Sequence, residues 1–320
     1  MGKPSLVSRI RALPSGQPRD FRKLGFLSAG YLLTLLLPRR LDQWTVGRLL
    51  RLPVVVRGAW IQKIVRSMRH HLGPILPDAD FESMARDFCE MTREIEWLRF
   101  RAYHTKKLPI QTSVEGLERL REAQEAGKGA ILWGMSFCEH LPVKVALQRA
   151  GVPLVHLSSA YHGVPDPCTP FGMKVVGPFY SAAEVPFLAE RVIIPQDGSL
   201  GYMRLLIDRL SKNQCVYIRG DYRSVRNNVN VRLFGRELPF APGAPGLSWK
   251  LGSPLLPLHV VREGPFRYRA VIHPPIDADR GQGKSPFIRQ TTDQFRNLME
   301  RCVLETPSNW DMLGVMERLY

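Results

Sequence analysis

Cysteine is scarce in this sequence and is not arranged in pairs. The five cysteines form no C-x-x-C pair. Neither a disulfide framework nor a zinc site is therefore expected, and no metal site is predicted. Cysteine usage of this kind is typical of a protein that works in a reducing compartment.

Acidic residues are almost missing from the first 73 positions. These positions hold 14 Lys and Arg residues against only Asp20 and Asp42, a local net charge of +12 within +16 for the whole chain. This excess indicates an anionic partner, either lipid headgroups or nucleic acid. No helix-turn-helix, RNP or zinc-finger pattern is present, which makes a nucleic acid the weaker alternative.

The sequence also lacks a hydrophobic run long enough to cross a bilayer. The uncharged run 24–38 has 15 residues, whereas a span needs about 20. No small-residue cleavage site follows it, so we do not expect a cleavable signal peptide. The run is either a buried core helix or a re-entrant or interfacial anchor with basic flanks at Lys23, Arg39 and Arg40. Because its neighbours are so basic, we expect the anchor and an anionic membrane surface as partner.

Three regions follow one another along the chain. Residues 1–20 are basic, contain three prolines and are expected to be loosely ordered. Residues 21–107 are expected to form a helical, membrane-facing region, because 81–104 carry apolar residues at helical spacing. Residues 108–320 alternate between strand and helix patterns and predict an α/β domain.

The α/β region predicts a mostly parallel sheet flanked by helices. A helix is expected over 113–127, and 267–272 are expected to form an antiparallel edge strand. The other predicted strands are 130–133, 152–157, 191–194, 215–218 and 255–261, and the other predicted helices are 143–150, 202–210 and 245–251. Residues 158–189 are rich in Pro and Gly and are interpreted as a functional crossover or lid.

The unit 130–157 reads as strand, helix and strand, and polar residues follow its first strand. They are Ser136, Cys138, Glu139 and His140 in the stretch "GMSFCEHLP". Ligands of such units usually lie beyond the carboxyl end of the strand. This stretch is therefore the first candidate for chemistry.

Several stretches together resemble a known family. They are "SVEGLERLREAQEAGKGAILWG", "VYIRGDYRSVRNNVNVRLFGRELPFAPGAPGLSWKLGSPLLPLHVVREG", "FRNLMERCVLETPSNWDMLGVMERLY" and "RSMRHHLGPILPDADFESMARDF". Their order resembles that in the late acyltransferases of lipid A assembly and in the mycobacterial acyltransferases that modify phosphatidylinositol mannosides. The resemblance covers roughly residues 20–320.

The resemblance implies a monotopic or peripheral protein on the cytoplasmic face of the inner membrane. It implies an enzyme of lipid biosynthesis that moves an acyl chain from an acyl carrier protein or CoA thioester to a hydroxyl or amine of a lipid-like acceptor. No cofactor beyond that thioester co-substrate is implied. The family's signature is a histidine, four residues and then an acid; the histidine acts as general base and the acid orients it.

The sequence departs from that signature at both positions. Ser136 stands where the histidine belongs and Leu141 where the acid belongs, and a serine hydroxyl is no base near neutral pH. Either the site has lost its chemistry, or a neighbour has replaced the base. If the segment is helical, His140 faces the same side as Ser136 and can form a hydroxyl–base pair. Cys138 is a further candidate nucleophile.

Two structural interpretations of the same stretch remain open. Ser136 and Glu139 fit a capping box at a helix start. Alternatively, Pro142 is the first helical residue and the stretch before it is a loop. Both explain the residues without catalysis.

Other candidate site residues follow from the resemblance. Asp221 in "IRGDYRS" follows a predicted strand and resembles an acidic position near the family's active site. Arg204, Arg223 and Arg226 are candidate ligands for phosphate, which guanidinium groups bind bidentately. The catalytic candidates are thus Ser136, His140 and Asp221.

His162 and Asp166 are a less direct candidate pair. Three residues separate them, not four, and they lie in a Pro-rich stretch. They would imitate the dyad only if that stretch folds over a pocket. The sequence therefore leaves two functions open: an acyltransferase with an altered site, or a catalytically inactive relative that binds an acyl thioester or lipid.

Overall fold

The computed structural model describes residues 17–36, 58–163, 169–195, 197, 199–224 and 227–311. Five positions named above lie outside these residues: Arg39, Arg40, Asp42, Asp166 and Arg226.

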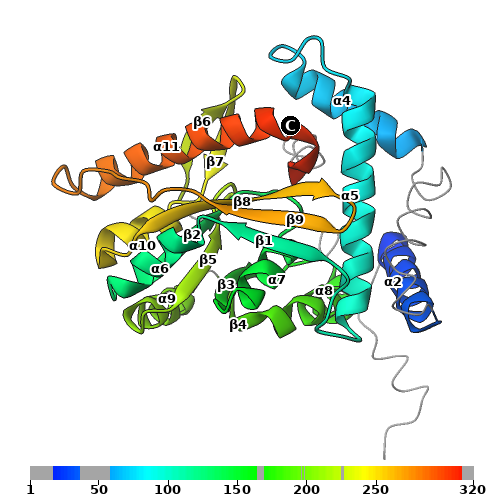
Figure 1. Cartoon of the computed structure of the whole chain (residues 1–320), viewed down its shortest axis with the longest axis horizontal. Helices are drawn as coiled ribbons and strands as arrows, with labels where there is room; N and C mark the ends of the chain where they lie inside the picture. Colours follow the sequence, from blue (N-terminus) through cyan, green and yellow to red (C-terminus); the bar gives the residue numbers. More distant parts are fainter. Residues whose placement is uncertain are drawn as a thin grey trace, which may run out of the picture.

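A seven-stranded sheet forms the centre of the protein (Figure 1). Its strand order is β1-β9-β8-β2-β5-β3-β4. The strands are β1 (Gln111–Glu115), β2 (Ala130–Gly134), β3 (Leu154–Ser159), β4 (Leu188–Ile194), β5 (Cys215–Arg219), β8 (Leu255–Gly264) and β9 (Arg267–Ile272). Five neighbouring strands, β8 to β4 in this order, are parallel; β1 and β9 are parallel to each other and run against them. The predicted α/β fold with a mostly parallel sheet is confirmed.

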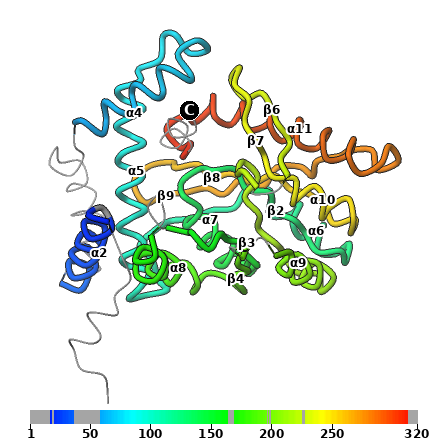
Figure 2. Tube along the Cα trace, turned by 180° about the vertical axis from the view of Figure 1, so that it is seen from behind, coloured from blue at the N-terminus to red at the C-terminus, as the bar shows by residue number. Residues whose placement is uncertain are grey.

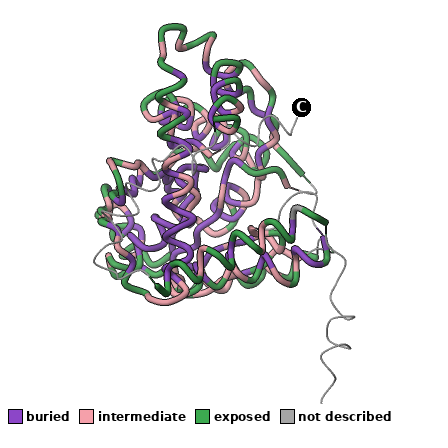
Figure 3. Tube along the Cα trace, turned by 90° about the vertical axis from the view of Figure 1, so that its right-hand side faces the viewer, coloured by how far each residue is buried: buried purple, intermediate pink, exposed green. Residues whose placement is uncertain are grey.

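The central strand β2 explains why the sheet is buried on both faces. All five residues of its sequence AILWG are buried, the continuous apolar run that parallel strands need when layers cover both sides. Leu132 and Trp133 point to opposite faces, because side chains alternate along a strand. Figure 3 shows the buried residues gathered in the middle of the molecule.

Helices cover both faces of the sheet. They are α6 (Leu117–Glu125), α7 (Leu141–Arg149), α8 (Gly177–Glu184), α9 (Gly201–Ser211), α10 (Gly243–Leu251) and α11 (Lys284–Glu305). Phe295 of α11 stacks on Trp133 with ring centroids 4.0 Å apart. The ring of His140, directly before α7, contacts Tyr217 of β5. Tyr217 is the register partner of Leu132, which points to the face opposite that of Trp133. α7 and α11 therefore lie on opposite faces.

Within the described residues, the helices α2 (Pro18–Leu36), α4 (Gly58–Leu72) and α5 (Phe81–Ala102) precede the sheet. The predicted helix 81–104 is thus confirmed; it begins where the Asp80 carboxylate accepts hydrogen bonds from the N–H groups of Glu82 and Ser83. α5 stands along one end of the sheet, and α2 and α4 both pack against it, with α2 on the side away from the sheet (Figures 1 and 2). None of the described helices is both long and apolar enough to cross a bilayer.

The predicted helix 113–127 is wrong in its first part, which forms β1 before α6 begins. Gly116 divides the two elements at φ +76°. A Cβ there would lie 2.2 Å from the carbonyl oxygen of Ile272, so the chain needs glycine to turn at this point.

Two strand predictions also change. β9 is antiparallel to β8, as expected, but β1 pairs outside it, so β9 is not an edge strand. The hairpin β6 (Val229–Leu233) and β7 (Arg236–Phe240) was not predicted. Its two turn residues, Phe234 and Gly235, both have positive φ, as a two-residue hairpin turn of type I′ requires.

The crossover 158–189 contains helical turns that the sequence pattern did not indicate. They are η3 (Gly172–Val176), α8 and η4 (Val185–Phe187). α8 packs against α5, so this part of the crossover forms the layer beside α7.

Candidate functional site

The candidate site lies at the carboxyl edge of the sheet, where β2 and β5 end. Asp221, two residues beyond β5, accepts hydrogen bonds from both the backbone N–H and the hydroxyl of Ser136, at 2.9 and 2.7 Å. Arg219 donates from Nε to the same carboxylate at 3.1 Å. Ser136 is 0% exposed and Asp221 is 3% exposed. Two catalytic candidates are therefore bonded to each other, and the serine hydroxyl is closed off from solvent.

The stretch after Ser136 is a loop and not a helix. Cys138, Glu139 and His140 all have positive φ, at 51°, 49° and 63°. α7 begins at Leu141 with Pro142 in its first turn. The capping-box interpretation is therefore wrong, and the alternative with Pro142 at the helix start is confirmed. The side-by-side helical arrangement of Ser136 and His140 does not occur.

The C-terminal segment holds this loop in place. The backbone N–H of Cys138 donates to the carbonyl of Asn309 at 3.0 Å, and that of Asp311 donates to the carbonyl of Ser136 at 2.9 Å. Trp310, fully buried between them, forms a β-bridge with Phe137. The tryptophan that carries part of the family resemblance thus sits directly under the candidate site.

Cys138 is not placed as a nucleophile. Its thiol is 0% exposed and contacts the carbonyl of Val260 at 3.6 Å. Burial raises its pKa well above the usual value, so the reactive thiolate does not form near neutral pH. Leu141, the first residue of α7, is also fully buried.

Glu139 is committed to other partners. Its carboxylate forms an ion pair with Arg99 of α5, and its backbone N–H donates to the Asp311 carboxylate at 2.6 Å. Burial and then the Glu139 charge raise the pKa of Asp311 well above its usual range. Asp311 was missed from the sequence, because only the fold brings the C-terminal segment to this loop.

His140 lies next to the site and binds Tyr217. Its Nδ1 forms a short hydrogen bond with the Tyr217 hydroxyl. Gly134 makes room for that hydroxyl, since a Cβ there would lie 2.4 Å from it. Burial, followed by the nearby charges of Arg219 and Lys144, lowers the pKa of His140 well below its usual value. The imidazole is therefore neutral, the state a general base needs.

A run of polar side chains continues from Tyr217 under α7. Ring centroids are 5.3 Å apart between Tyr217 and His156 and 6.4 Å apart between His156 and His162. His162 Nε2 lies 3.2 Å from an Oε of Glu184, and the same oxygen accepts a short hydrogen bond from Lys144. Sequence reasoning missed Glu184, since no spacing rule connects it to His162.

The Glu184 carboxylate is ionised. Burial by itself would raise its pKa, but Lys144 and then His162 hold that pKa well below the usual value. Lys144 and Glu184 are both fully buried, whereas the His162 side chain is 21% exposed. His162 is thus an imidazole whose Nε2 faces a buried carboxylate and whose side chain is partly open to solvent.

The candidate phosphate ligands are less closely tied to the site. Arg204 on α9 and Arg223 after β5 are both exposed. Arg219, which the sequence did not single out, contacts Asp221 directly and lies over the Tyr222 ring at 5.5 Å.

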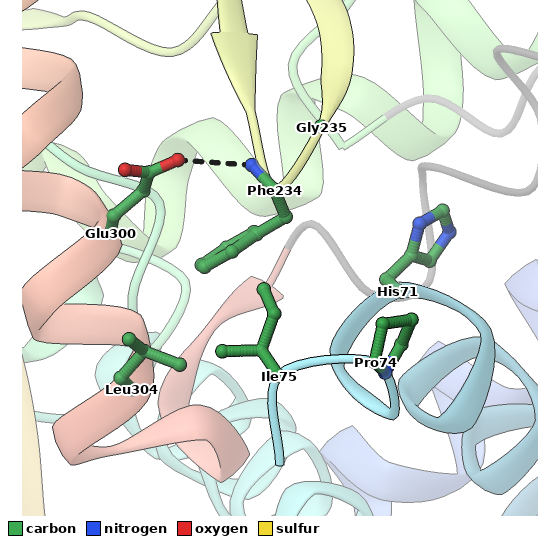
Figure 4. A pocket seen from close by; sticks show the side chains of 7 residues that line it. All are labelled: His71, Pro74, Ile75, Phe234, Gly235, Glu300 and Leu304. Atoms are coloured by element: carbon green, nitrogen blue, oxygen red, sulfur yellow. Dashed lines mark hydrogen bonds between the residues drawn. The ribbon is translucent and has the colours of Figure 1, made fainter. Parts of the chain in front are cut away.

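A pocket of about 410 Å³ lies elsewhere, between the end of α4, the β6–β7 turn and α11 (Figure 4). It is lined by His71, Pro74, Ile75, Phe234, Gly235, Glu300 and Leu304. Glu300 accepts a hydrogen bond from the backbone N–H of Phe234 at 3.0 Å across its rim. The lining includes none of the candidate catalytic residues.

The fold and the site together define an α/β protein with a polar centre at the carboxyl edge of a mostly parallel sheet. Residues 188–315 match the family of bacterial lipid A biosynthesis acyltransferases. The match contains Asp221, Arg219 and Trp310, and over residues 188–315 it confirms the resemblance found in the sequence. It supports an acyltransferase family and a lipid acyltransferase-like role.

Two other comparisons complete this picture. The chain is similar to the crystal structure of the 1-acyl-sn-glycerophosphate acyltransferase PlsC from Thermotoga maritima, with 14% identity, a TM-score of 0.36, and coverage of 90% of this chain and 98% of that one. No curated protein matches the chain.

Proposed function

We propose that this protein is a membrane-associated acyltransferase with a relocated base. It moves an acyl chain from an acyl carrier protein or CoA thioester to a hydroxyl or amine of a lipid-like acceptor. The observation that carries the proposal is the His162–Glu184 pair, with 3.2 Å between imidazole and carboxylate and a partly exposed imidazole. It has the two chemical parts of the family's signature, a base and the acid that orients it.

The proposed reaction uses this pair in one proton cycle. His162 removes the proton from the acceptor hydroxyl, and the oxygen attacks the thioester carbonyl carbon. The C–S bond then breaks, and the leaving thiolate takes the proton from the imidazolium. Glu184 faces Nε2 and stabilises the imidazolium, which leaves Nδ1 to accept the proton.

His140 is the alternative base within the same proposal. It is neutral and closer to Ser136 in the chain, but its Nδ1 is bonded to Tyr217. Its Nε2 is a base only in the tautomer in which Nδ1 donates to the Tyr217 oxygen. His162 Nε2 faces a carboxylate, which can only accept a proton or hydrogen bond, so the proton is held on Nε2 and Nδ1 stays free as the base; for that reason we favour His162.

Membrane association and location belong to the same proposal. α2 exposes several large apolar side chains beside Lys23 and Arg22, which suits an anionic surface. We place the protein on the cytoplasmic face of the inner membrane, where acyl thioesters are available. Arg204, Arg223 and Arg226 are the proposed contacts for carrier or lipid phosphate.

The second candidate function is an inactive relative that binds an acyl thioester or lipid. The complete burial of Ser136 and Leu141, at the two signature positions, favours it. Neither side chain touches solvent, so neither meets a substrate in this conformation.

The test is thioester turnover by the full-length protein with vesicles that supply acceptor lipid. Mass spectrometry follows the acyl carrier thioester and the acylated lipid. We expect His162→Ala to lower turnover about 10²–10⁴-fold, the usual contribution of a positioned base. His70→Ala, an exposed histidine on α4, is the matched control and is expected to keep full activity.

Each other outcome selects a different explanation. Turnover that survives His162→Ala but is lost in His140→Ala would assign the base to His140. Thioester binding without wild-type turnover would support the inactive relative. Loss of turnover only in Cys138→Ala would contradict both bases and indicate a thiol nucleophile.

A further inference from the structure

Two histidines and a cysteine converge on the opposite face of the sheet from α7. His259 Nδ1 and His273 Nε2 are 2.9 Å apart. Cys302 Sγ lies 3.9 Å from the first and 3.8 Å from the second. All three ligand atoms fall within 4.8 Å of one another. The triangle they form is compact enough for one ion.

Three separate elements build this triangle. His259 lies in β8 with Val271 of β9 as its register partner, and His273 lies two residues after Val271, directly after the end of β9. Register partners on neighbouring strands point to the same face of the sheet, and so do residues two apart along the chain of a strand. His273 therefore shares the face of Val271 and of His259, and both imidazoles point to the layer of α11. Cys302 lies in α11. The two rings are nearly parallel, with centroids 5.0 Å apart and 18° between their planes.

The triangle has the size of a zinc site. Zinc binds imidazole nitrogen at about 2.0–2.1 Å and thiolate sulfur at about 2.3 Å. In a tetrahedron these bonds place nitrogen and sulfur about 3.6 Å apart and two nitrogens about 3.3 Å apart. The observed separations of 3.9, 3.8 and 2.9 Å need shifts of a few tenths of an ångström only.

The protonation states suit metal binding on the nitrogen side. Burial lowers the pKa of His259 to about 3 and that of His273 to about 4. Both rings are therefore neutral near pH 7 and each has one nitrogen lone pair to give. Burial raises the pKa of the Cys302 thiol to about 12, so its proton must leave when a metal binds.

We propose that His259, His273 and Cys302 form a three-ligand zinc site with its fourth position open beside His273. A depression of about 340 Å³ lies there, and Pro257, His273, Gln294 and Arg301 are among the residues that line it. Three protein ligands and one open position are the arrangement of zinc sites that bind water or another small ligand. The site is separate from the proposed acyl-transfer centre and does not depend on it.

Charged neighbours set the conditions for binding. Arg119 and Arg301 lie close enough to lower the pKa of His273, Arg269 acts on His259 in the same way, and Glu115 opposes them. These cations weaken attraction for Zn²⁺ and favour an anionic fourth ligand. Because the thiol must lose its proton, zinc affinity is expected to fall as the pH is lowered.

The experiment is metal titration of the full-length protein after treatment with a chelator. Calorimetry with Zn²⁺ is expected to give one equivalent. Co²⁺ is expected to give a near-ultraviolet thiolate charge-transfer band and visible bands of tetrahedral cobalt. Cys302→Ser is expected to abolish the charge-transfer band, and His273→Ala to weaken zinc binding by about 100-fold or more, beyond the 10–100-fold typical of outer-shell changes.

The control is Cys215→Ser. Cys215 is also buried, and burial likewise raises its pKa to about 12, but it lies in β5 away from both histidines. It is expected to keep the zinc stoichiometry and the cobalt spectrum. Circular dichroism checks that each variant is folded; His273 is only half-buried, so its alanine variant is expected to fold. Zinc affinity unchanged in both ligand variants, or no zinc binding by the wild type, would overturn the site.

Discussion

Ser136 anchors the loop that precedes α7. Two hydrogen bonds tie it to the buried carboxylate of Asp221. Hydrogen bonds to charged groups contribute about 1.5–3 kcal/mol each, so this pair holds the end of β2 to the end of β5. The Ser136 side chain is thus part of the support of the site.

The three left-handed residues after it store backbone strain. For residues with a Cβ, this conformation costs roughly 1–2 kcal/mol each. The contacts of Glu139 with Arg99 and Asp311, and of His140 with Tyr217, offset that cost. Strain of this kind occurs where a chain must present side chains in one defined direction.

This strain predicts a difference between two variants of His140. His140→Gly and His140→Ala both remove the imidazole, but glycine adopts φ +63° without a Cβ clash. We expect the glycine variant to be more stable than the alanine variant by about 1 kcal/mol, measured by urea unfolding at pH 7.5.

Ala146→Gly in the middle of α7 is the control, because φ there is helical and glycine is expected to destabilise by about 0.5–1 kcal/mol. Equal stability of the two His140 variants would mean that the left-handed backbone is not under strain.

At the scale of elements, α2 is the helix with the most unusual surface. Its buried side rests on α5, where Leu27 is 1% exposed and Phe26 meets Phe100 with ring centroids 5.6 Å apart. Its other side exposes large apolar residues, among them Phe21, Leu32, Leu33, Leu35 and Leu36. Such a face, next to basic residues, is typical of a helix that lies in a membrane interface.

The exposed face of α2 predicts vesicle binding. Leu32 and Leu36 are 57% and 80% exposed and lie one turn apart. We expect the double change Leu32→Glu with Leu36→Glu to weaken binding to phosphatidylglycerol vesicles at least about tenfold, because each buried leucine contributes about 1.5–3 kcal/mol. Co-sedimentation measures the bound fraction.

Leu200→Glu with Leu205→Glu is the matched control, with the same added charge at two other exposed leucines. It is expected to bind almost normally. Salt is expected to weaken wild-type binding only in part, since insertion of apolar side chains is not screened. An equal loss of vesicle binding in both double variants would show that the added negative charge, and not the apolar face of α2, determines the binding.

At the scale of the whole molecule, buried histidines make the fold sensitive to acid. Burial lowers the pKa of His140 and His156 well below the usual value, that of His259 to about 3 and that of His273 to about 4. The unfolded chain binds protons at these residues near pH 6.5, and the folded chain does not. Stability is therefore full above about pH 6.5 and is lost as the pH falls below it.

The expected slope is up to about 1.4 kcal/mol per pH unit for each of these histidines. Urea unfolding between pH 7.5 and 5.0, in the presence of a chelator, measures it. The raised pKa of Asp311 has the opposite effect on stability, because the folded chain binds this proton more tightly than the unfolded chain does. It is a single group and offsets one histidine at most. Glu184 adds to the loss below about pH 4.5, since its pKa is lowered.

His156→Gln tests the cause of this acid sensitivity. The variant removes one titrating group from the buried cluster under α7. It is expected to reduce the slope of the unfolding free energy against pH by up to about 1.4 kcal/mol per pH unit, the contribution of one proton. A stability that does not change between pH 7.5 and 5.0 would contradict the assignment of these histidines as buried and neutral.

The sequence alone determined the fold class of this protein and much of its sheet. Apolar runs such as 130–133 and 215–218 predicted β2 and β5 because a strand covered on both faces must be apolar throughout. Asp221 was likewise placed at a strand end from sequence, and the structure has it two residues beyond β5. These features depend on residues close together in the chain.

Only the tertiary structure decided which polar side chains meet. Glu184 reaches His162 across the crossover, Asp311 reaches the loop after Ser136 from the C-terminal segment, and Cys302 reaches His259 from α11. No periodicity or spacing rule relates these pairs. Their contacts follow from how the helices and the C-terminal segment pack on the sheet, and that packing depends on the whole core at once.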